Sequence, residues 1–301
     1  MSHMTRAHRR EALAFYLCIS PWLIGFIFLT VGPMLYSLYI SFTRWDLLTD
    51  PVWVGLRNYT VKMPGDERFW QSLKVTILYT LAYVPLELIG GLALALLVQR
   101  RIRGIRLFRT LFYLPSVLAG VAFAVVWLWM LDPRGGLVNL ILAQFGIVGP
   151  RWLLDPDWAL PALVMMSFWG WGRVMVIYLA GLQAIPGELY EAAAIDGASS
   201  WTRFWRVTIP LLTPTIFFNL ILSIISTFQS FTNAFVATNG GPLDSTLFYV
   251  LYLYKQAFEF RAMGYASALA WVLFVIILVL TLVVLRSQRF WVFYAGERSD
   301  G

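Results

Sequence analysis

Residues 264–286 read GYASALAWVLFVIILVLTLVVLR and carry no charged side chain until the final arginine. The hydrocarbon core of a bilayer, about 30 Å thick, is crossed by roughly 20 mostly apolar helical residues. This stretch therefore predicts a membrane-spanning helix. Working outward from it, five further apolar runs of sufficient length lie at residues 13–42, 72–98, 107–131, 158–182 and 208–236. We expect an all-α integral membrane protein with six transmembrane helices.

The composition supports the same class of protein. Of 301 residues, 59% are hydrophobic and 13% are charged, against roughly 45–50% and about 25% in soluble chains. So few charges disfavour a soluble enzyme, a disordered chain and a nucleic-acid binder. The lone Cys18 can form no internal disulfide, and both histidines, His3 and His8, lie in the first eight residues. We therefore expect no disulfide framework, no metal site and no cofactor held by this chain.

Lysines and arginines are distributed unequally between alternate gaps separating the predicted spans. One set of gaps holds thirteen: Arg6, Arg9, Arg10, Arg100, Arg101, Arg103, Arg106, Arg109, Arg203, Arg206, Arg286, Arg289 and Arg298. The other set holds eight: Arg44, Arg57, Lys62, Arg68, Arg134, Arg151, Lys255 and Arg261. Because cytoplasmic loops are enriched in these residues, both termini are predicted to be cytoplasmic. The formal net charge of +7 then faces anionic lipid headgroups, without need of a nucleic-acid partner.

This topology divides the chain into three parts. Residues 1–12 form a cytoplasmic N-terminal segment, residues 13–286 the membrane domain, and residues 287–301 a cytoplasmic C-terminal tail. The loop at about 183–210, between spans four and five, also lies on the cytoplasmic side.

That loop reads QAIPGELYEAAAIDGASSWTRFWRVTIP over residues 183–210. Pro186 favours a helix start, and Gly197 suits the left-handed conformation that ends a helix, which predicts a helix of about ten residues. Glu188 and Glu191 lie where the helix dipole favours anions. A second short helix is predicted at the membrane interface, begun by Ser199 or Ser200, with an aromatic side and two arginines (Trp201, Phe204, Trp205, Arg203 and Arg206). Two interpretations remain open: a solvated connector, or a helix that docks on a partner.

Two motifs resemble those of a known family. Glu191-Ala192-Ala193, then Gly197, then Val207-x-Ile209-Pro210, is similar to the EAA loop of permease subunits of bacterial ATP-binding-cassette importers. The sequence departs from that pattern only by apolar exchanges at Val207 and Ile209. Residues 238–242, Thr-Asn-Gly-Gly-Pro, resemble a second signature found in the carbohydrate-uptake branch. At this spacing the chain resembles the first permease of the maltose type and the glycerol-3-phosphate type.

The resemblance implies a type I importer permease with a cytoplasmic coupling helix, in the plasma membrane of a bacterium. It implies that the ATPase-coupling residues are Glu188, Glu191, Ala192, Ala193, Asp196, Gly197 and Ala198. A second permease subunit, an ATPase dimer and an extracytoplasmic sugar-binding protein would be the partners. The contact with the binding protein would involve Asn239, Gly240, Gly241 and Pro242, with the loop at 44–70. No G-x-x-x-x-G-K-[ST] loop occurs in this chain, so ATP-Mg would be bound by the separate ATPase and this subunit would not be an enzyme.

Polar residues inside the predicted spans suggest a substrate pathway, because such residues are costly in lipid. Arg173 lies in span four, close to Gly170, and Glu87 lies in span two. Span five carries Ser223, Ser226, Thr227, Gln229, Ser230 and Asn233. Two roles are open for these residues: an Arg173–Glu87 pair and hydroxyl-mediated helix packing, or contacts with a substrate. The resemblance places Arg173, Ser223, Ser226, Thr227 and Ser230 at the sugar site, with a disaccharide, an oligosaccharide or a glycerol-phosphate-like polyol as candidate substrates.

Two other classes of function compete with the importer. An ion-coupled secondary transporter is the main alternative, but it needs coupling carboxylates and often internal repeats. Glu87 is the only clear carboxylate inside a predicted span, and no repeat is evident. An integral-membrane enzyme is disfavoured because no histidine, cysteine and carboxylate constellation assembles.

Overall fold

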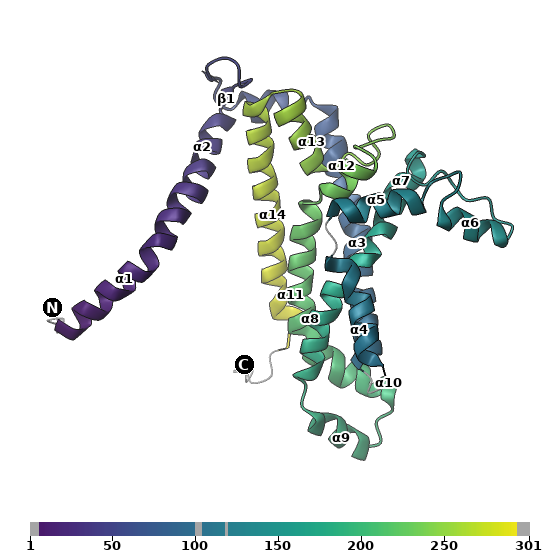
Figure 1. Cartoon of the computed structure of the whole chain (residues 1–301). Helices are drawn as coiled ribbons and strands as arrows, with labels where there is room; N and C mark the ends of the chain where they lie inside the picture. The colour runs from purple at the N-terminus through teal and green to yellow at the C-terminus, as the bar shows by residue number, and fades with distance from the viewer. Residues whose placement is uncertain (1–5, 100–103, 118–119, 294–301) are drawn as a thin grey trace. The chain divides into compact units, whose positions relative to one another are not determined.

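The computed structural model describes residues 6–99, 104–117 and 120–293 (Figure 1). The chain forms two compact units, one comprising residues 6–65 and 253–272 and the other residues 66–252 and 273–293. Arg100, Arg101, Arg103 and Arg298, which contribute to the predicted topology, lie outside the described residues.

The smaller unit begins with a long apolar helix. Its elements are α1 (Arg6–Phe26), a π-helical turn (Ile27–Val31), α2 (Gly32–Ser41), β1 (Thr43–Arg44), β2 (Val52–Trp53), a π-helical turn (Asn58–Lys62), the end of α13 (Tyr249–Tyr254), a π-helical turn (Lys255–Glu259) and the start of α14 (Met263–Trp291). In the most apolar 18-residue stretch of Glu11–Ser41, no residue is buried. A helix that is apolar all round and unburied is suited to contact with lipid or another subunit.

Side-chain hydrogen bonds fix the chain where it leaves α2. Strands β1 and β2 pair antiparallel, with Thr43 opposite Trp53. The Asn58 amide donates to the carbonyls of Ser41 at 2.8 Å and Thr43 at 2.9 Å. Between the strands, the backbone N–H and hydroxyl of Thr49 and the backbone N–H of residue 48 donate to Asp46, which lowers the pKa of that carboxyl below its ordinary value.

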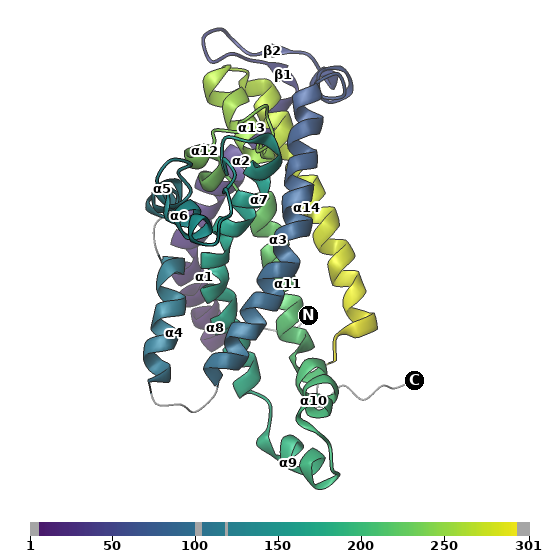
Figure 2. The same cartoon turned by 90° about the vertical axis from the view of Figure 1, so that its right-hand side faces the viewer.

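The larger unit is built around three helices that run side by side, α3, α8 and α11 (Figures 1 and 2). Its elements are α3 (Glu67–Gln99), α4 (Ile105–Tyr113), a 3₁₀ turn η3 (Leu114–Val117), α5 (Gly120–Met130), α6 (Leu137–Gln144), α7 (Pro156–Met166), a 3₁₀ turn η4 (Ser167–Gly170), α8 (Trp171–Gln183), α9 (Gly187–Ile195), α10 (Ser200–Arg203), a π-helical turn η5 (Phe204–Thr208), α11 (Ile209–Phe228) and α12 (Thr232–Ala237), with the starts of α13 and the end of α14.

Close approach between α3 and α8 holds this bundle together. A Cβ on Gly90 of α3 would lie 2.2 Å from the Trp171 ring, so only glycine allows the two helices this near. One turn further on, Val174, Tyr178 and Leu182 of α8 pack with residues of α3 and α11 in a buried apolar cluster. Close-packed interiors have low compressibility and transmit strain between the elements that form them.

Five helical stretches among the described residues are long and apolar enough to cross a membrane. They cover Glu11–Ser41, Glu67–Gln99, Pro156–Gln183, Ser200–Ala237 and Met263–Trp291. Each contains or overlaps a span predicted from the sequence. The count becomes six if the bent pair Ile105–Val117 and Gly120–Met130 is one span.

The third predicted span, residues 107–131, corresponds to two helices and not to one continuous helix. Helices α4 and α5 lie on either side of residues 118–119 and are bent by 101°. Pro115, inside η3, has no N–H to donate to the preceding turn and its ring disfavours the helix before it. The apolar composition alone did not indicate the bend, because a hydropathy pattern records length and not direction.

Candidate functional site

A cavity of about 240 Å³ opens inside the larger unit, where six elements meet. Its lining is Tyr79, Tyr83, Pro115, Ser116, Gly120, Phe123, Ser167, Gly170, Ser226, Thr227, Ser230 and Asn233. The lining comes from α3, η3, α5, η4, α11 and α12, with Ser230 in the segment between α11 and α12. We refer to it as the bundle cavity.

The bundle cavity coincides with interruptions in three of the predicted spans. The 3₁₀ turn η3 separates α4 from α5, the 3₁₀ turn η4 separates α7 from α8, and residues 229–231 separate α11 from α12. Each of these interruptions contributes lining residues. Non-helical backbone at membrane depth is tolerated where it lines a protected or water-filled cavity. Discontinuous helices are also the usual place where transporters bind substrate.

The cavity wall combines aromatic faces with hydroxyl groups. The rings of Tyr79 and Tyr83 stack with centroids 5.5 Å apart, and the Tyr79 hydroxyl is 2.5 Å from the Ser167 hydroxyl. Within the described part of the chain, the side chains of Ser230 and Asn233 have no hydrogen-bond partner. A hydroxyl and an amide so placed offer both donors and acceptors. This chemistry suits a polyhydroxylated ligand.

The structure brings together most of the predicted pathway residues and leaves three of them outside. Gly170, Ser226, Thr227, Ser230 and Asn233 line the bundle cavity. The cavity lining does not include Arg173, Ser223 or Gln229. Ser223 is buried in α11, and Gln229 is exposed beside the break that follows that helix.

Sequence reasoning did not single out Tyr79, Tyr83 or Ser167. A signal was present in α3, where Thr76 and Thr80, and Tyr79, Tyr83 and Glu87, recur at four-residue steps. Such spacing places polar groups on one helix face, and all five residues are buried. A polar stripe within an apolar span therefore indicates a face directed at other helices.

Arg173 and Glu87 face each other one turn beyond the bundle cavity. The guanidinium Nη2 lies 4.0 Å from Glu87 Oε1. Glu87, four residues after Tyr83 on α3, is 2% exposed, whereas the Arg173 side chain is 56% exposed. The other carboxylate oxygen, Glu87 Oε2, has no hydrogen-bond partner. Of the two roles left open by the sequence, the geometry favours an inter-helix pair between α3 and α8.

Further buried polar groups surround this pair. Tyr178 lies near both Glu87 and Asn219. Both side-chain polar atoms of Asn219 and the Ser223 hydroxyl, one turn apart on α11, are buried with no hydrogen-bond partner. Unpartnered buried groups are costly. The centre of the bundle next to the bundle cavity is therefore polar. Single substitutions there should change the stability of the fold.

The helix predicted in the loop between spans four and five forms as expected. Helix α9 follows Pro186 and ends before Gly197, whose φ is +77°. Two backbone bonds close its end, from Gly197 N–H to Ala194 O at 3.1 Å and from Ala198 N–H to Ala193 O at 2.9 Å. This pair of backbone hydrogen bonds is the Schellman motif.

No residue of α9 is buried. Glu188, Glu191, Ala192, Asp196 and Gly197 are exposed, and Ala193 and Ala198 are half-buried. Ile195, an apolar side chain, is 87% exposed. In Figures 1 and 2 the helix projects from the end of α8. An ordered helix with acidic, small and apolar residues uncovered has the properties of a docking element.

The second part of the loop also agrees with the sequence. The Ser199 side chain caps α10 by accepting from the Thr202 N–H at 3.2 Å. The rings of Trp201, Phe204 and Trp205 contact one another. Tyr190 of α9 is tied to Thr208 by a 3.0 Å hydrogen bond between their hydroxyls. Because Thr208 directly precedes α11, this bond links α9 to α11, while residues 184–186 link it to α8.

The Thr-Asn-Gly-Gly-Pro segment forms a tight turn after α12. Thr246 Oγ1 donates to Gly241 O at 2.7 Å and lies 2.6 Å from the Thr238 hydroxyl. Asn239 is exposed, Gly241 and Pro242 are half-buried, and Gly240 is buried. The following Asp244 pairs with Arg68 at 3.0 Å. The turn is held against the start of α3, and Leu243 at its tip is 88% exposed.

Among the described residues, no group of three or more His, Cys, Asp or Glu side chains could hold a metal ion.

Comparison with known proteins identifies what the chain resembles as a whole. Residues 87–292 match the family model described as a binding-protein-dependent transport system inner membrane component. The chain is 46% identical over 297 residues to a probable ABC transporter permease protein of Bacillus subtilis (strain 168), covering 97% of this chain and 96% of the relative. It is 35% identical over 283 residues to the trehalose/maltose transport system permease protein of Thermococcus litoralis, with 93% and 95% covered.

A solved structure shares the fold. It is the crystal structure of a bacterial ABC transporter involved in the import of the acidic polysaccharide alginate. The superposition gives a TM-score of 0.81 at 23% identity, covering 93% of this chain and 96% of the other. The fold expected from the sequence, that of a type I importer permease, is confirmed.

Proposed function

We propose that this chain is the permease subunit of an ATP-driven sugar importer. The chain belongs to the family of inner membrane components of binding-protein-dependent transport systems. In this role the chain forms one half of the translocation pathway through the membrane. The observation that carries the proposal is the convergence of three helix breaks on one cavity lined by hydroxyl, amide and tyrosine side chains. The similarity to a trehalose/maltose permease supports a sugar as the substrate class.

The proposed assembly contains four kinds of protein. A second permease subunit completes the pathway, an ATPase dimer binds ATP-Mg on the cytoplasmic side, and an extracytoplasmic protein delivers the sugar. Both termini of this chain and α9 lie in the cytoplasm, as the lysine and arginine distribution predicts. The same distribution predicts that the turn at 238–242 and the loop at 44–70 face the opposite side of the membrane, where we propose that the binding protein docks.

We infer that α9 transmits the force of ATP hydrolysis to the bundle cavity. Its exposed surface, including Glu191 and Ala192, seats on the ATPase. Residues 184–186 join α9 to α8, and the Tyr190–Thr208 bond joins it to the start of α11. Both helices supply or directly adjoin cavity residues, through Gly170 and Ser226. Movement of α9 therefore changes the cavity without any contact between nucleotide and sugar.

The bundle cavity can be tested with two substitutions and a neighbouring control. We expect Asn233→Ala and Ser230→Ala each to weaken sugar uptake by the assembled importer by roughly tenfold, as the loss of one substrate hydrogen bond of about 1.4 kcal/mol implies. Gln229→Ala, at an exposed neighbouring residue outside the cavity lining, should retain normal uptake. The measurement is initial uptake of labelled sugar into proteoliposomes holding all subunits, ATP and binding protein.

Two outcomes would count against this function. Equal uptake by all three variants would show that the bundle cavity is not on the sugar pathway. Uptake by this chain reconstituted alone, driven by an ion gradient and not by ATP, would favour the secondary transporter.

A further inference from the structure

The connection between α5 and α7 is unusually apolar for a loop. Residues 135–150, GGLVNLILAQFGIVGP, contain no charged residue, and Arg134 and Arg151 stand at either end. Six large apolar side chains are exposed there: Leu137, Leu140, Ile141, Phe145, Ile147 and Val148, the last at 95%. We refer to residues 133–152 as the apolar hairpin. An exposed apolar surface of this size indicates contact with lipid or protein.

The apolar hairpin is nevertheless an ordered structure. Its helix α6 ends in a Schellman motif, with Gly146 N–H donating to Ala143 O and Ile147 N–H to Leu142 O, both at 3.0 Å. Before the helix, Asp132 Oδ1 accepts from the Arg134 N–H at 2.8 Å. The C-terminal end of α6 is thus closed by bonds inside the hairpin, and Asp132 orders the turn that precedes the helix.

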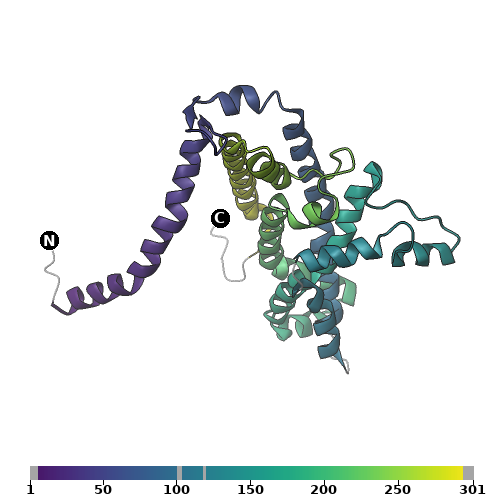
Figure 3. The same cartoon turned by 45° about the horizontal axis from the view of Figure 1, so that its top comes forward.

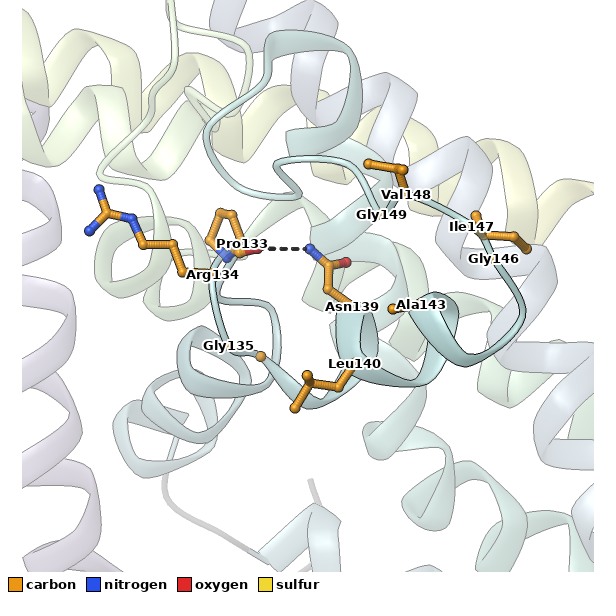
Figure 4. A pocket seen from close by; sticks show the side chains of 11 residues that line it. Pro133, Arg134, Gly135, Asn139, Leu140, Ala143, Gly146, Ile147, Val148 and Gly149 are labelled. Carbon is orange, nitrogen blue, oxygen red and sulfur yellow. Dashed lines mark hydrogen bonds between the residues drawn. The ribbon is translucent and has the colours of Figure 1, made fainter.

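Asn139 joins the two ends of the apolar hairpin by hydrogen bonds. Its amide nitrogen donates to Pro133 O at 3.4 Å and Pro150 O at 3.3 Å, and its oxygen accepts from the Trp152 indole at 2.7 Å. In Figure 4 the Asn139 side chain points at Pro133, whereas Arg134 turns away from the hollow within the hairpin. That hollow has a volume of about 440 Å³. Asn139, one of two polar side chains between the arginines, is therefore used to hold the two ends of the hairpin together.

The apolar hairpin connects two helices that belong to candidate membrane spans. It begins directly after α5 and ends before α7. Figures 1 and 3 show α6 projecting sideways from the α3–α8–α11 bundle, nearer the end opposite α9. A second hollow of about 250 Å³ connects it to α5, lined by Trp129, Met130, Gly135, Leu137 and Leu140.

We propose that the apolar hairpin embeds in the interfacial region of the lipid bilayer and binds phospholipid headgroups through Arg134 and Arg151. Sixteen uncharged residues with an eight-residue helix are too few to cross the membrane, which needs roughly 20, but suit an element lying within one leaflet. Neither arginine forms an ion pair with any carboxylate of the described residues. Both guanidinium groups are therefore available to bind the phosphate of a lipid headgroup. Trp152, apolar with one polar N–H, is typical of the headgroup level.

The proposal depends on the chain being a membrane protein and not on its substrate, so a test needs no uptake measurement. The exposed Cys18 is replaced by serine, and single cysteines are placed at Val148, at Thr49 in the β1–β2 turn, and at Val283 in the apolar α14. Each carries an environment-sensitive fluorophore in the full importer, reconstituted in nanodiscs of phosphatidylethanolamine and phosphatidylglycerol. Quenching by doxyl-labelled lipid and by aqueous iodide is then compared among the three sites.

We expect the Val148 probe to be quenched by doxyl lipid to about the extent of the Val283 probe, and by iodide about threefold less than the Thr49 probe. Strong iodide quenching that disappears only when the binding protein is added would overturn the proposal in favour of a protein contact. Quenching by neither agent would place the apolar hairpin against the second permease subunit and would equally overturn it. Arg134→Gln with Arg151→Gln should lower the doxyl quenching at Val148, and unchanged quenching would reject the headgroup role.

Discussion

The Glu191→Lys variant should lose ATP-driven uptake by at least about tenfold and should copurify poorly with the ATPase, since reversing one charge at a complementary interface costs several kcal/mol of association. Glu191 is exposed in the middle of α9. Lysine at this position would place a cation where the proposed ATPase contact receives an anion. The measurements are sugar uptake by the reconstituted importer and the amount of ATPase that copurifies.

A charge reversal at another exposed acid distinguishes loss of docking from a general loss of folding. Asp157→Lys changes an exposed acid in the first turn of α7, far along the chain from α9. It should leave ATPase copurification and uptake close to normal. If Glu191→Lys assembled and transported as well as the unaltered chain, α9 would not be the coupling element.

The Arg173→Ala variant should be destabilised, and adding Glu87→Gln should restore much of the loss. Removing the arginine leaves the Glu87 carboxylate buried without its counter-charge. A fully buried broken pair costs roughly 3–5 kcal/mol, and we expect about 2 kcal/mol because the Arg173 side chain is half exposed. The glutamine removes the stranded charge. The measurement is the thermal unfolding midpoint of the purified importer for both single variants and the double variant.

The double variant distinguishes two roles for Arg173. Recovery of stability together with normal uptake would assign the arginine to the inter-helix pair alone. Recovery of stability without uptake would show that its exposed guanidinium also contacts the substrate. An Arg173→Ala chain as stable as the unaltered chain would contradict the pairing.

The sequence predicted the features that depend on local chemistry. Apolar length gave the spans, because crossing a membrane requires it whatever the packing. The ends of α9 followed from Pro186 and Gly197, since the first suits a helix start and the second a left-handed residue. Hydroxyl and amide residues at helical spacing in span five predicted much of one cavity wall, including Ser226, Ser230 and Asn233.

Features that depend on how helices meet could not be predicted from the sequence. The breaks at Ser167–Gly170 and 229–231 have no proline at the break itself, and the meeting of these breaks at one cavity becomes visible only in the folded chain. The contribution of Tyr79 to the bundle cavity follows from the approach of α3 to η4. Glu87 and Arg173 are 86 positions apart in the sequence, so only the fold could decide between a pair and two separate groups.

Cross-linking from α9 to the ATPase tests most directly whether this chain is coupled to a separate ATPase subunit. Ala192→Cys, exposed on α9, is placed in a Cys18→Ser chain and treated with a short bifunctional thiol reagent in the transporting importer, with Val148→Cys as the remote control. We predict a covalent adduct between Ala192→Cys and the ATPase whose yield changes when ATP is added, and none from the control. A cysteine at 192 that stays freely reactive, with no adduct while uptake proceeds, would contradict the proposed coupling.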